Sequence, residues 1–227
     1  MGPPHRFAVR AVTFDIGGTL IAPWPSVGHI YAQVAAEHGH TGLAPELLNQ
    51  QFGSAWQARK DFQHTQAQWA ELVDATFFGL IDAIPSRTFF PQLFERFAQP
   101  AAWRIFDDVR PALDMLRSRG LRLGVISNWD HRLRPLLRGL NLVDYFECLV
   151  ISCEVGCSKP ARGAFERAAK LMSLAPETLL HIGDSPEMDV QGARAAGFGA
   201  VLLDRDAGEA SRGTIRSLRD LGHLITG

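Results

Sequence analysis

The stretch Ala11-Val12-Thr13-Phe14-Asp15-Ile16-Gly17-Gly18-Thr19-Leu20 decides the predicted fold. An apolar, β-branched run ends at Asp15, and two glycines follow almost at once. This pattern predicts a buried strand over residues 9–14 that delivers Asp15 into a tight loop. Ligands of open α/β sheets bind just past the carboxyl ends of the strands. Asp15 is therefore a candidate nucleophile or metal ligand, although the stretch by itself fits an ordinary turn aspartate equally well.

Strand-like and helix-like segments alternate in the second half of the chain. Short apolar runs predict strands over residues 121–126, 147–152, 178–182 and 199–203. Helical spacing and helix-terminal residues predict helices over residues 109–118, 131–140, 161–171, 190–196 and near 217–224. The alternation predicts an α/β fold, with a Rossmann-like parallel sheet flanked by helices on both faces.

The segment between the first and second predicted strands differs from the rest. Its apolar residues recur at helical spacing and predict four helices, over residues 27–39, 45–60, 66–83 and 87–97. An all-α block inside an α/β chain indicates an inserted cap. We expect an α/β core domain of residues 1–22 and 103–227 and a helical cap domain of residues 23–102, whose aromatic side chains mainly pack its own core.

Three later segments can join Asp15 in one site. The first is Ser127-Asn128, which follows a strand-like run, and the second is Lys159-Pro160. The third is Gly183-Asp184-Ser185-Pro186-Glu187-Met188-Asp189, which follows another strand-like run. With the Asp15 segment, these four motifs in this order resemble the haloacid dehalogenase-like (HAD) hydrolase superfamily. The resemblance extends from about Val9 to Leu203.

The resemblance implies phosphatase-type chemistry on a small phosphorylated molecule. Asp15 would be the nucleophile that forms an aspartyl-phosphate, and Lys159 would neutralise the phosphate and this carboxylate. Thr19, Ser127 and Asn128 match the positions that bind the phosphate.

The resemblance also implies a magnesium ion. Its ligands would be Asp15, the backbone oxygen of Gly17 and Asp184, with Asp189 acting through water or by orienting the other ligands. Magnesium prefers oxygen ligands and typically takes one or two carboxylates. The ordinary interpretation of Asp184 and Asp189 is a pair of acids at the start of a helix.

One residue departs from the family pattern. Most phosphatases of the superfamily have a second aspartate two residues after the nucleophile, which protonates the leaving group and later activates water; this chain has Gly17. General acid–base catalysis contributes about 10²–10⁴-fold, so we expect slow turnover, least impaired on aryl phosphates. His29, Asp130 and His131 are the nearest candidates for a replacement acid.

Three alternatives remain open. A catalytically weak or inactive relative could bind a ligand or partner through the same site, which Gly17 favours. A 2-haloacid dehalogenase also lacks the second aspartate, but its cap arginine has no counterpart before Arg59. A phosphonate-cleaving enzyme would need a Schiff-base lysine in the cap, for which Lys60 is the one cap lysine.

Composition excludes several classes of protein. Among 227 residues, 23 basic and 24 acidic side chains give a net charge of −1, which favours neither nucleic acid nor an anionic membrane. No apolar run is long enough to span a bilayer, and no signal-peptide pattern is present. Three clustered cysteines do not suggest a disulfide framework. We expect a cytoplasmic protein with reduced cysteines, as a monomer or homodimer.

Overall fold

The computed structural model describes residues 7–59, 61–207 and 213–226. The chain forms two compact units. One comprises residues 1–21, 105–131 and 141–227, and the other comprises residues 22–104 and 132–140.

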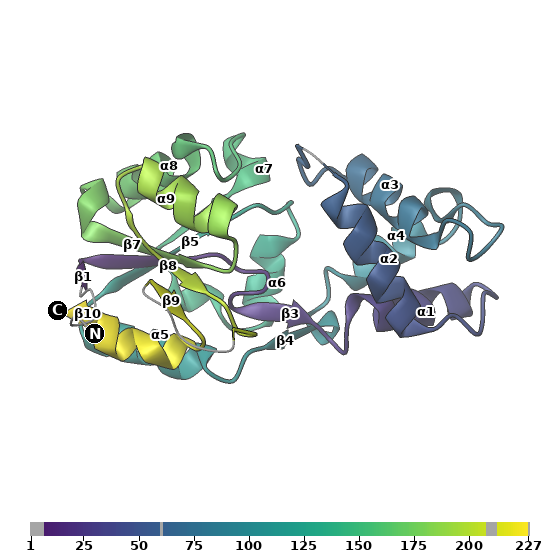
Figure 1. The fold of residues 1–227 in the computed structure, drawn as a ribbon, viewed down its shortest axis with the longest axis horizontal. Helices are drawn as coiled ribbons and strands as arrows, with labels where there is room; N and C mark the ends of the chain where they lie inside the picture. The colour runs from purple at the N-terminus through teal and green to yellow at the C-terminus, as the bar shows by residue number, and fades with distance from the viewer. Residues whose placement is uncertain (1–6, 60, 208–212, 227) are drawn as a thin grey trace. The chain divides into compact units, whose positions relative to one another are not determined.

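The first unit is built on a parallel sheet of six strands (Figure 1). In sequence order these are β2 (Ala11–Phe14), β5 (Arg122–Ser127), β6 (Cys148–Ile151), β7 (Leu179–Gly183), β8 (Gly199–Leu203) and β9 (Thr214–Ile215). Their order in the sheet is β6-β5-β2-β7-β8-β9, and each described pair of neighbours is parallel. The α/β, Rossmann-like prediction is confirmed, with β9 as an additional strand that the sequence analysis did not include.

The register of β2 determines where Asp15 lies. Phe14 is paired with Val125 of β5 on one side and with Ile182 of β7 on the other. The backbone N–H of Asp15 then donates to the Ile182 carbonyl at 2.9 Å. Because parallel strands end at a common edge, the loops after β2, β5 and β7 converge there.

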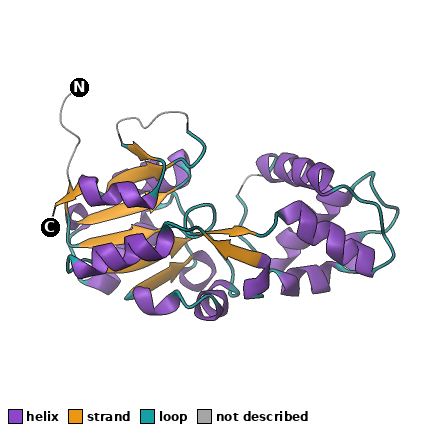
Figure 2. Cartoon of the chain, turned by 90° about the horizontal axis from the view of Figure 1, so that it is seen from below, coloured by secondary structure: helices purple, strands orange, loops and turns teal. Residues whose placement is uncertain are grey.

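Helices cover both faces of this sheet, as the orange strands between purple helices in Figure 2 show. The helices of this unit are α5 (Val109–Ser118), α7 (Ser152–Val155), α8 (Arg162–Met172), α9 (Gly192–Ala195) and α10 (Leu221–Leu224). Helices α8 and α9 lie on one face and α5 on the other (Figure 1). Phe165 and Met172 of α8 are fully buried in the core beneath this helix. Burying a side chain of this size contributes about 1.5–3 kcal/mol.

Several short elements were not predicted. Strand β1 (Phe7–Ala8) pairs with β10 (Ile225–Thr226), and β3 (Ile21–Pro23) pairs with β4 (Trp103–Ile105), where the chain leaves and re-enters the α/β unit. Single 3₁₀ turns are formed by Pro85–Arg87, Pro100–Ala102, Val143–Tyr145, Pro176–Thr178 and Leu218–Asp220. The helix predicted over 190–196 begins earlier, as a π-helical turn over Pro186–Gln191 that continues into α9.

The second unit is helical and has its own core. It contains α1 (Val27–Glu37), α2 (Pro45–Gln57), α3 (Gln66–Phe77), α4 (Phe90–Arg96) and α6 (Leu133–Gly139). Tyr31 lies at its centre, stacked on Phe77 with ring centroids 5.7 Å apart. The aromatic residues around Tyr31 mainly pack against one another, as the sequence pattern indicated. Lys60, on which the phosphonate alternative depends, lies outside the described residues.

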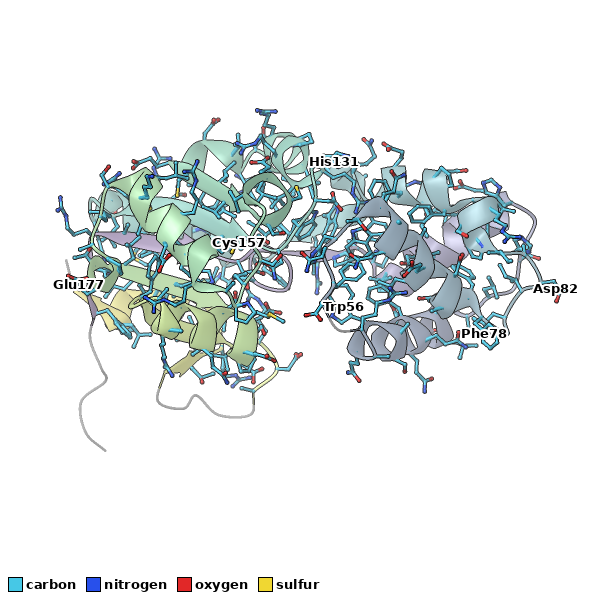
Figure 3. The ribbon with its side chains drawn as sticks, turned by 90° about the horizontal axis from the view of Figure 1, so that it is seen from above. Trp56, Phe78, Asp82, His131, Cys157 and Glu177 are labelled. Carbon is cyan, nitrogen blue, oxygen red and sulfur yellow. The ribbon has the colours of Figure 1, made fainter. Side chains whose placement is uncertain are left out.

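Helix α3 is shorter than its periodicity predicts. It ends at Phe77, because Phe78 takes a ψ of 125° and Gly79 has a φ of +76°, which no helix can continue. Phe78 is 84% exposed and points away from its unit, on a loop that also carries Asp82 (Figure 3). None of the described helices is long and apolar enough to cross a membrane.

Residues 132–140 group with the helical unit, whereas the sequence predicted that residues 103–227 all belong to the core domain. The guanidinium of Arg132 lies 3.5 Å from the centroid of the Phe94 ring and donates to the Phe94 carbonyl at 2.8 Å. Gly139 lies so close to Pro100 that an added Cβ would be 2.5 Å from its Cγ. These contacts, and not the chain order, assign α6 to this unit.

Candidate active site

Asp15 lies at the carboxyl edge of the sheet, almost buried. Its Oδ1 accepts a hydrogen bond from the Ser127 hydroxyl at 2.9 Å and from the Lys159 ammonium at 2.6 Å. Burial raises the pKa of Asp15 above its ordinary value, although the ammonium and the hydroxyl oppose this rise. Both described side-chain donors reach the same oxygen, so Oδ2 is the atom of Asp15 that can face a substrate or a cation.

Lys159 joins two carboxylates in the buried part of the site. Its Nζ lies 2.6 Å from Asp15 Oδ1 and 2.5 Å from Asp189 Oδ1. Burial alone would lower the pKa of Lys159, but the two carboxylates raise it above its ordinary value, so the side chain stays charged. Asn128 holds the backbone of this lysine: its Oδ1 accepts from the Lys159 N–H at 2.7 Å, and its Nδ2 donates to the Lys159 carbonyl at 2.9 Å.

Three carboxylates meet at this edge. One oxygen of each of Asp15, Asp184 and Asp189 lies within 4.8 Å of the others. Desolvation and the negative charges of the other two carboxylates raise the pKa of Asp184 to about 7, although its side chain still reaches solvent. Burial would also raise the pKa of Asp189, but Lys159 and His181 lower it well below its usual range.

The charge of the site fits a divalent cation. When all are ionised, the three carboxylates and the one ammonium carry a net charge of −2. Desolvation is the largest cause of the raised pKa of Asp184, and the negative charges of Asp15 and Asp189 add to it. Carboxylate oxygens are the donors that magnesium and calcium take in proteins, so the residues present are a suitable ligand set for the magnesium ion that the sequence analysis expected.

His181 supports the site from within the sheet and was missed by sequence reasoning. It is fully buried on β7, with Nε2 3.0 Å from Asp189 Oδ1 and Nδ1 2.9 Å from the Thr13 hydroxyl. Burial lowers the pKa of this imidazole, so it is neutral at pH 7. The available signal was a polar residue inside the apolar run Leu179-Leu180-His181-Ile182, because a buried polar side chain needs a partner.

The glycine loop after Asp15 is shaped around Asp184. Gly18 has a φ of +74°, and a Cβ added to it would lie 2.3 Å from Asp184 Oδ2. Both the backbone conformation and the approach of this carboxylate therefore favour glycine at position 18. Thr19, expected to bind phosphate, is fully buried and donates to Asp184 Oδ1 at 3.4 Å. In this arrangement its hydroxyl supports the carboxylate.

The structure thus brings together Asp15, Ser127, Lys159, Asp184 and Asp189, while Asn128 joins through the Lys159 backbone and Thr19 through Asp184. The candidate replacement acids are placed differently. Asp130 is buried, His131 is exposed (Figure 3), and His29, in the helical unit, lies 2.8 Å from the Ser26 hydroxyl. None of the contacts described for Asp15 involves these three residues.

Comparisons with known proteins identify the family of this chain. Residues 9–197 match the family model described as a haloacid dehalogenase-like hydrolase. Human haloacid dehalogenase-like hydrolase domain-containing protein 3 is 33% identical over 210 residues, and the match covers 88% of this chain and 83% of the human protein. Phosphoglycolate phosphatase of Thiobacillus denitrificans is 29% identical over 196 residues, covering 83% of this chain and 80% of its own.

Solved structures extend this similarity. A HAD phosphatase from Thermococcus onnurineus is 25% identical, with a TM-score of 0.69 and coverage of 94% of this chain and 96% of its own. Structures less than 25% identical also include 2-haloacid dehalogenases, which shows a shared fold and no more. From the family model, the relatives and the placement of its four motifs, the chain belongs to the haloacid dehalogenase-like hydrolases.

Proposed function

We propose that the protein is a magnesium-dependent phosphatase that acts on a small phosphate ester through an aspartyl-phosphate at Asp15. The arrangement of Asp15 carries the proposal. Its carboxylate lies at the carboxyl edge of a parallel sheet, 2.6 Å from a buried ammonium and beside two further carboxylates. Phosphatases among the relatives support the same reaction class.

Asp15, Asp184 and Asp189 are the side chains that would hold the magnesium ion, and Gly17 would add its backbone oxygen. When bound, the ion would supply positive charge for the phosphoryl oxygens and offset the −2 charge of the ligand set. Lys159 already compensates Asp15 and Asp189. A dianionic phosphate group could otherwise not approach three ionised carboxylates.

The chain's own residues account for the two chemical steps. Ser127 and Lys159 hold Oδ1 of Asp15, so that Oδ2 can attack the phosphorus atom. A bond forms between Oδ2 and phosphorus, and the bond from phosphorus to the ester oxygen breaks, with its electron pair leaving on that oxygen. Water then attacks the aspartyl-phosphate, which releases inorganic phosphate and restores the carboxylate.

Gly17 makes this proposed enzyme slow. A missing general acid–base group costs about 10²–10⁴-fold in rate, or roughly 3–5 kcal/mol of barrier. Esters with good leaving groups need the least help from an acid. We therefore expect hydrolysis of aryl phosphates to exceed that of alkyl phosphates, and the aspartyl-phosphate to accumulate because its hydrolysis lacks a base.

The decisive test is hydrolysis of an aryl phosphate with and without magnesium, in the native protein and in Asp15→Asn. Asp82→Asn is the matched control, because Asp82 is exposed on the loop that follows α3 (Figure 3). We expect activity that requires both magnesium and Asp15 and that Asp82→Asn retains. Equal activity of native protein and Asp15→Asn would refute covalent catalysis at Asp15.

Gly17 also favours a second candidate, a relative that has lost catalysis and binds a phosphorylated ligand at the same site. This candidate predicts folded protein that binds magnesium without Asp15-dependent turnover. Titration with magnesium and inorganic phosphate, followed by thermal unfolding, would then show stabilisation while the aryl phosphate assay shows none of the expected hydrolysis.

A further inference from the structure

The indole ring of Trp129 lies close to the place where a side chain at position 17 would begin. A Cβ added to Gly17 would lie 3.2 Å from Cζ3 of the indole and 3.9 Å from Cη2. Carbon atoms pack favourably at about 3.5–4.0 Å, so the first of these contacts is too close. Unlike Gly18, Gly17 does not have a positive φ. The indole ring, and not the backbone conformation, therefore restricts what residue 17 can be.

The backbone of Trp129 is held in place on two sides. Its N–H donates to the Ser152 hydroxyl at 3.0 Å, and that hydroxyl donates back to the Trp129 carbonyl at 3.1 Å. The same carbonyl accepts from the Cys153 N–H at 3.3 Å. On the preceding residue, the Asn128 side chain is hydrogen-bonded to the Lys159 backbone. The main chain that carries the indole is therefore held, and a larger residue 17 would fit only if the ring itself shifted.

We propose that Trp129 replaces the side chain at position 17 and forms the leaving-group side of the site, so that the protein selects phosphate esters of acidic hydroxyl groups, such as phenols. The inference rests on the proposed function and gives its substrate class. The resemblance to the family's phosphatases implies an acid at position 17 that protonates the leaving group, so the leaving group would lie beside this position. An indole is not an acid that can protonate a leaving group near neutral pH, but it offers an aromatic surface against which a phenyl leaving group can stack.

The basicity of the leaving group also favours aryl esters. When the bond between phosphorus and the ester oxygen breaks, a phenol leaves as phenolate, which is stable enough to depart before it takes a proton from water. An alkyl alcohol would leave as a strongly basic alkoxide and would need the acid that Gly17 cannot supply. The same residue pair thus disfavours alkyl esters and accommodates aryl esters.

The test is a set of variants assayed on one aryl phosphate and one alkyl phosphate with magnesium: Gly17→Asp, Trp129→Ala, the double variant Gly17→Asp/Trp129→Ala, and Gly17→Asn/Trp129→Ala as an isosteric control without an acid. We expect Gly17→Asp to raise kcat/KM for the alkyl phosphate less when Trp129 is present than in the Trp129→Ala background. The Asp double variant should raise it at least about tenfold above the Asn double variant, part of the usual general-acid contribution.

Trp129→Ala alone should raise KM for the aryl phosphate relative to the alkyl phosphate, by about two- to tenfold if a stacking contact is lost. An equal gain in alkyl phosphate hydrolysis from Gly17→Asp with and without Trp129 would overturn the inference. So would a double variant that gains nothing over its Asn control, or an unchanged ratio of the two KM values in Trp129→Ala.

Thermal unfolding tests the packing separately from the chemistry. Gly17→Ala should lower Tm when Trp129 is present and lower it less in the Trp129→Ala background, because the added methyl group then has room. Equal effects would show that the two residues are not in contact. If the native protein shows no activity that depends on Asp15, both the proposed function and this substrate class are refuted. If the native protein is active but its variants do not behave as expected, only the role of Trp129 is refuted.

Discussion

Replacing Lys159 with methionine would leave two carboxylates without their shared positive charge. The Lys159 side chain is 3% exposed, and its ammonium lies 2.6 Å from Asp15 and 2.5 Å from Asp189. Methionine is similar in length, so the change removes charge with little loss of volume. Removing one partner of a buried ion pair costs about 3–5 kcal/mol. We expect the free energy of unfolding to fall by about this amount at pH 7 without metal.

The deficit should depend on pH with a defined sign. In the native protein, the ammonium holds the pKa of Asp189 below its ordinary value, so this group stabilises the fold above pH 4 and less in acid. In Lys159→Met the buried carboxylates bind protons more readily in the folded state than in the unfolded chain. The difference between variant and native protein should therefore be largest near neutral pH and decline as the pH falls toward the unfolded carboxyl pKa of about 4.

Urea unfolding followed by circular dichroism measures this difference. Lys170→Met is the matched control, since Lys170 is exposed on α8, and it should change the free energy of unfolding by no more than about 0.5 kcal/mol. The double variant Lys159→Met/Asp189→Asn should regain part of the loss, because one uncompensated charge is removed. Equal stability of Lys159→Met and Lys170→Met would refute the argument that the ammonium compensates the two carboxylates.

Three further predictions follow from contacts around the site. Gly18→Ala should abolish the rise in Tm on adding magnesium, because its Cβ would lie 2.3 Å from Asp184 Oδ2. Gly39→Ala is the control and should keep that rise, since Gly39 also has a positive φ but an added Cβ would have nothing within 4 Å. Equal responses of the two variants would contradict the prediction. Asp108→Asn should destabilise the protein by about 1–3 kcal/mol at pH 7. Burial alone would raise the pKa of Asp108, but its hydrogen-bond donors, among them Arg205, lower it. In urea unfolding, the difference in the free energy of unfolding between native protein and variant should shrink below pH 4, and a constant difference would count against the prediction. His181→Phe should cost about 1–3 kcal/mol in the same assay, since it removes a buried hydrogen-bond partner of the site, and an unchanged urea midpoint would argue against this supporting role.

Local pattern was sufficient to predict the edge of the sheet at which the site lies. The apolar run before Asp15 and the one before Ser127 each predict a strand, and parallel strands end at one edge. The end of α3 was predicted less well, since periodicity continues past Phe77 while Phe78 and Gly79 leave the helical conformation. A hydrophobic pattern defines a helical face, but not where the backbone turns away.

The assignment of residues 132–140 could not be read from the chain order. Their apolar stripe predicts an amphipathic helix but does not say which core it covers. Arg132 decides this by placing its guanidinium over the Phe94 ring, a contact between residues 38 positions apart. Such a pairing depends on how separate elements pack, and the hydrophobic periodicity within one element does not predict its packing partner.

The sequence by itself determined the α/β fold, the helical insertion and the four motifs that identify the family, because each depends on the spacing of residues that are close together in the sequence. Only the tertiary structure decided that one ammonium joins Asp15 to Asp189, that His181 supports Asp189 from within the sheet, and that Trp129 lies against Gly17. Lys159 and Asp15 are 144 positions apart. The physical reason is that side-chain distances between separate strands and loops arise from packing of the whole unit, which no single segment specifies.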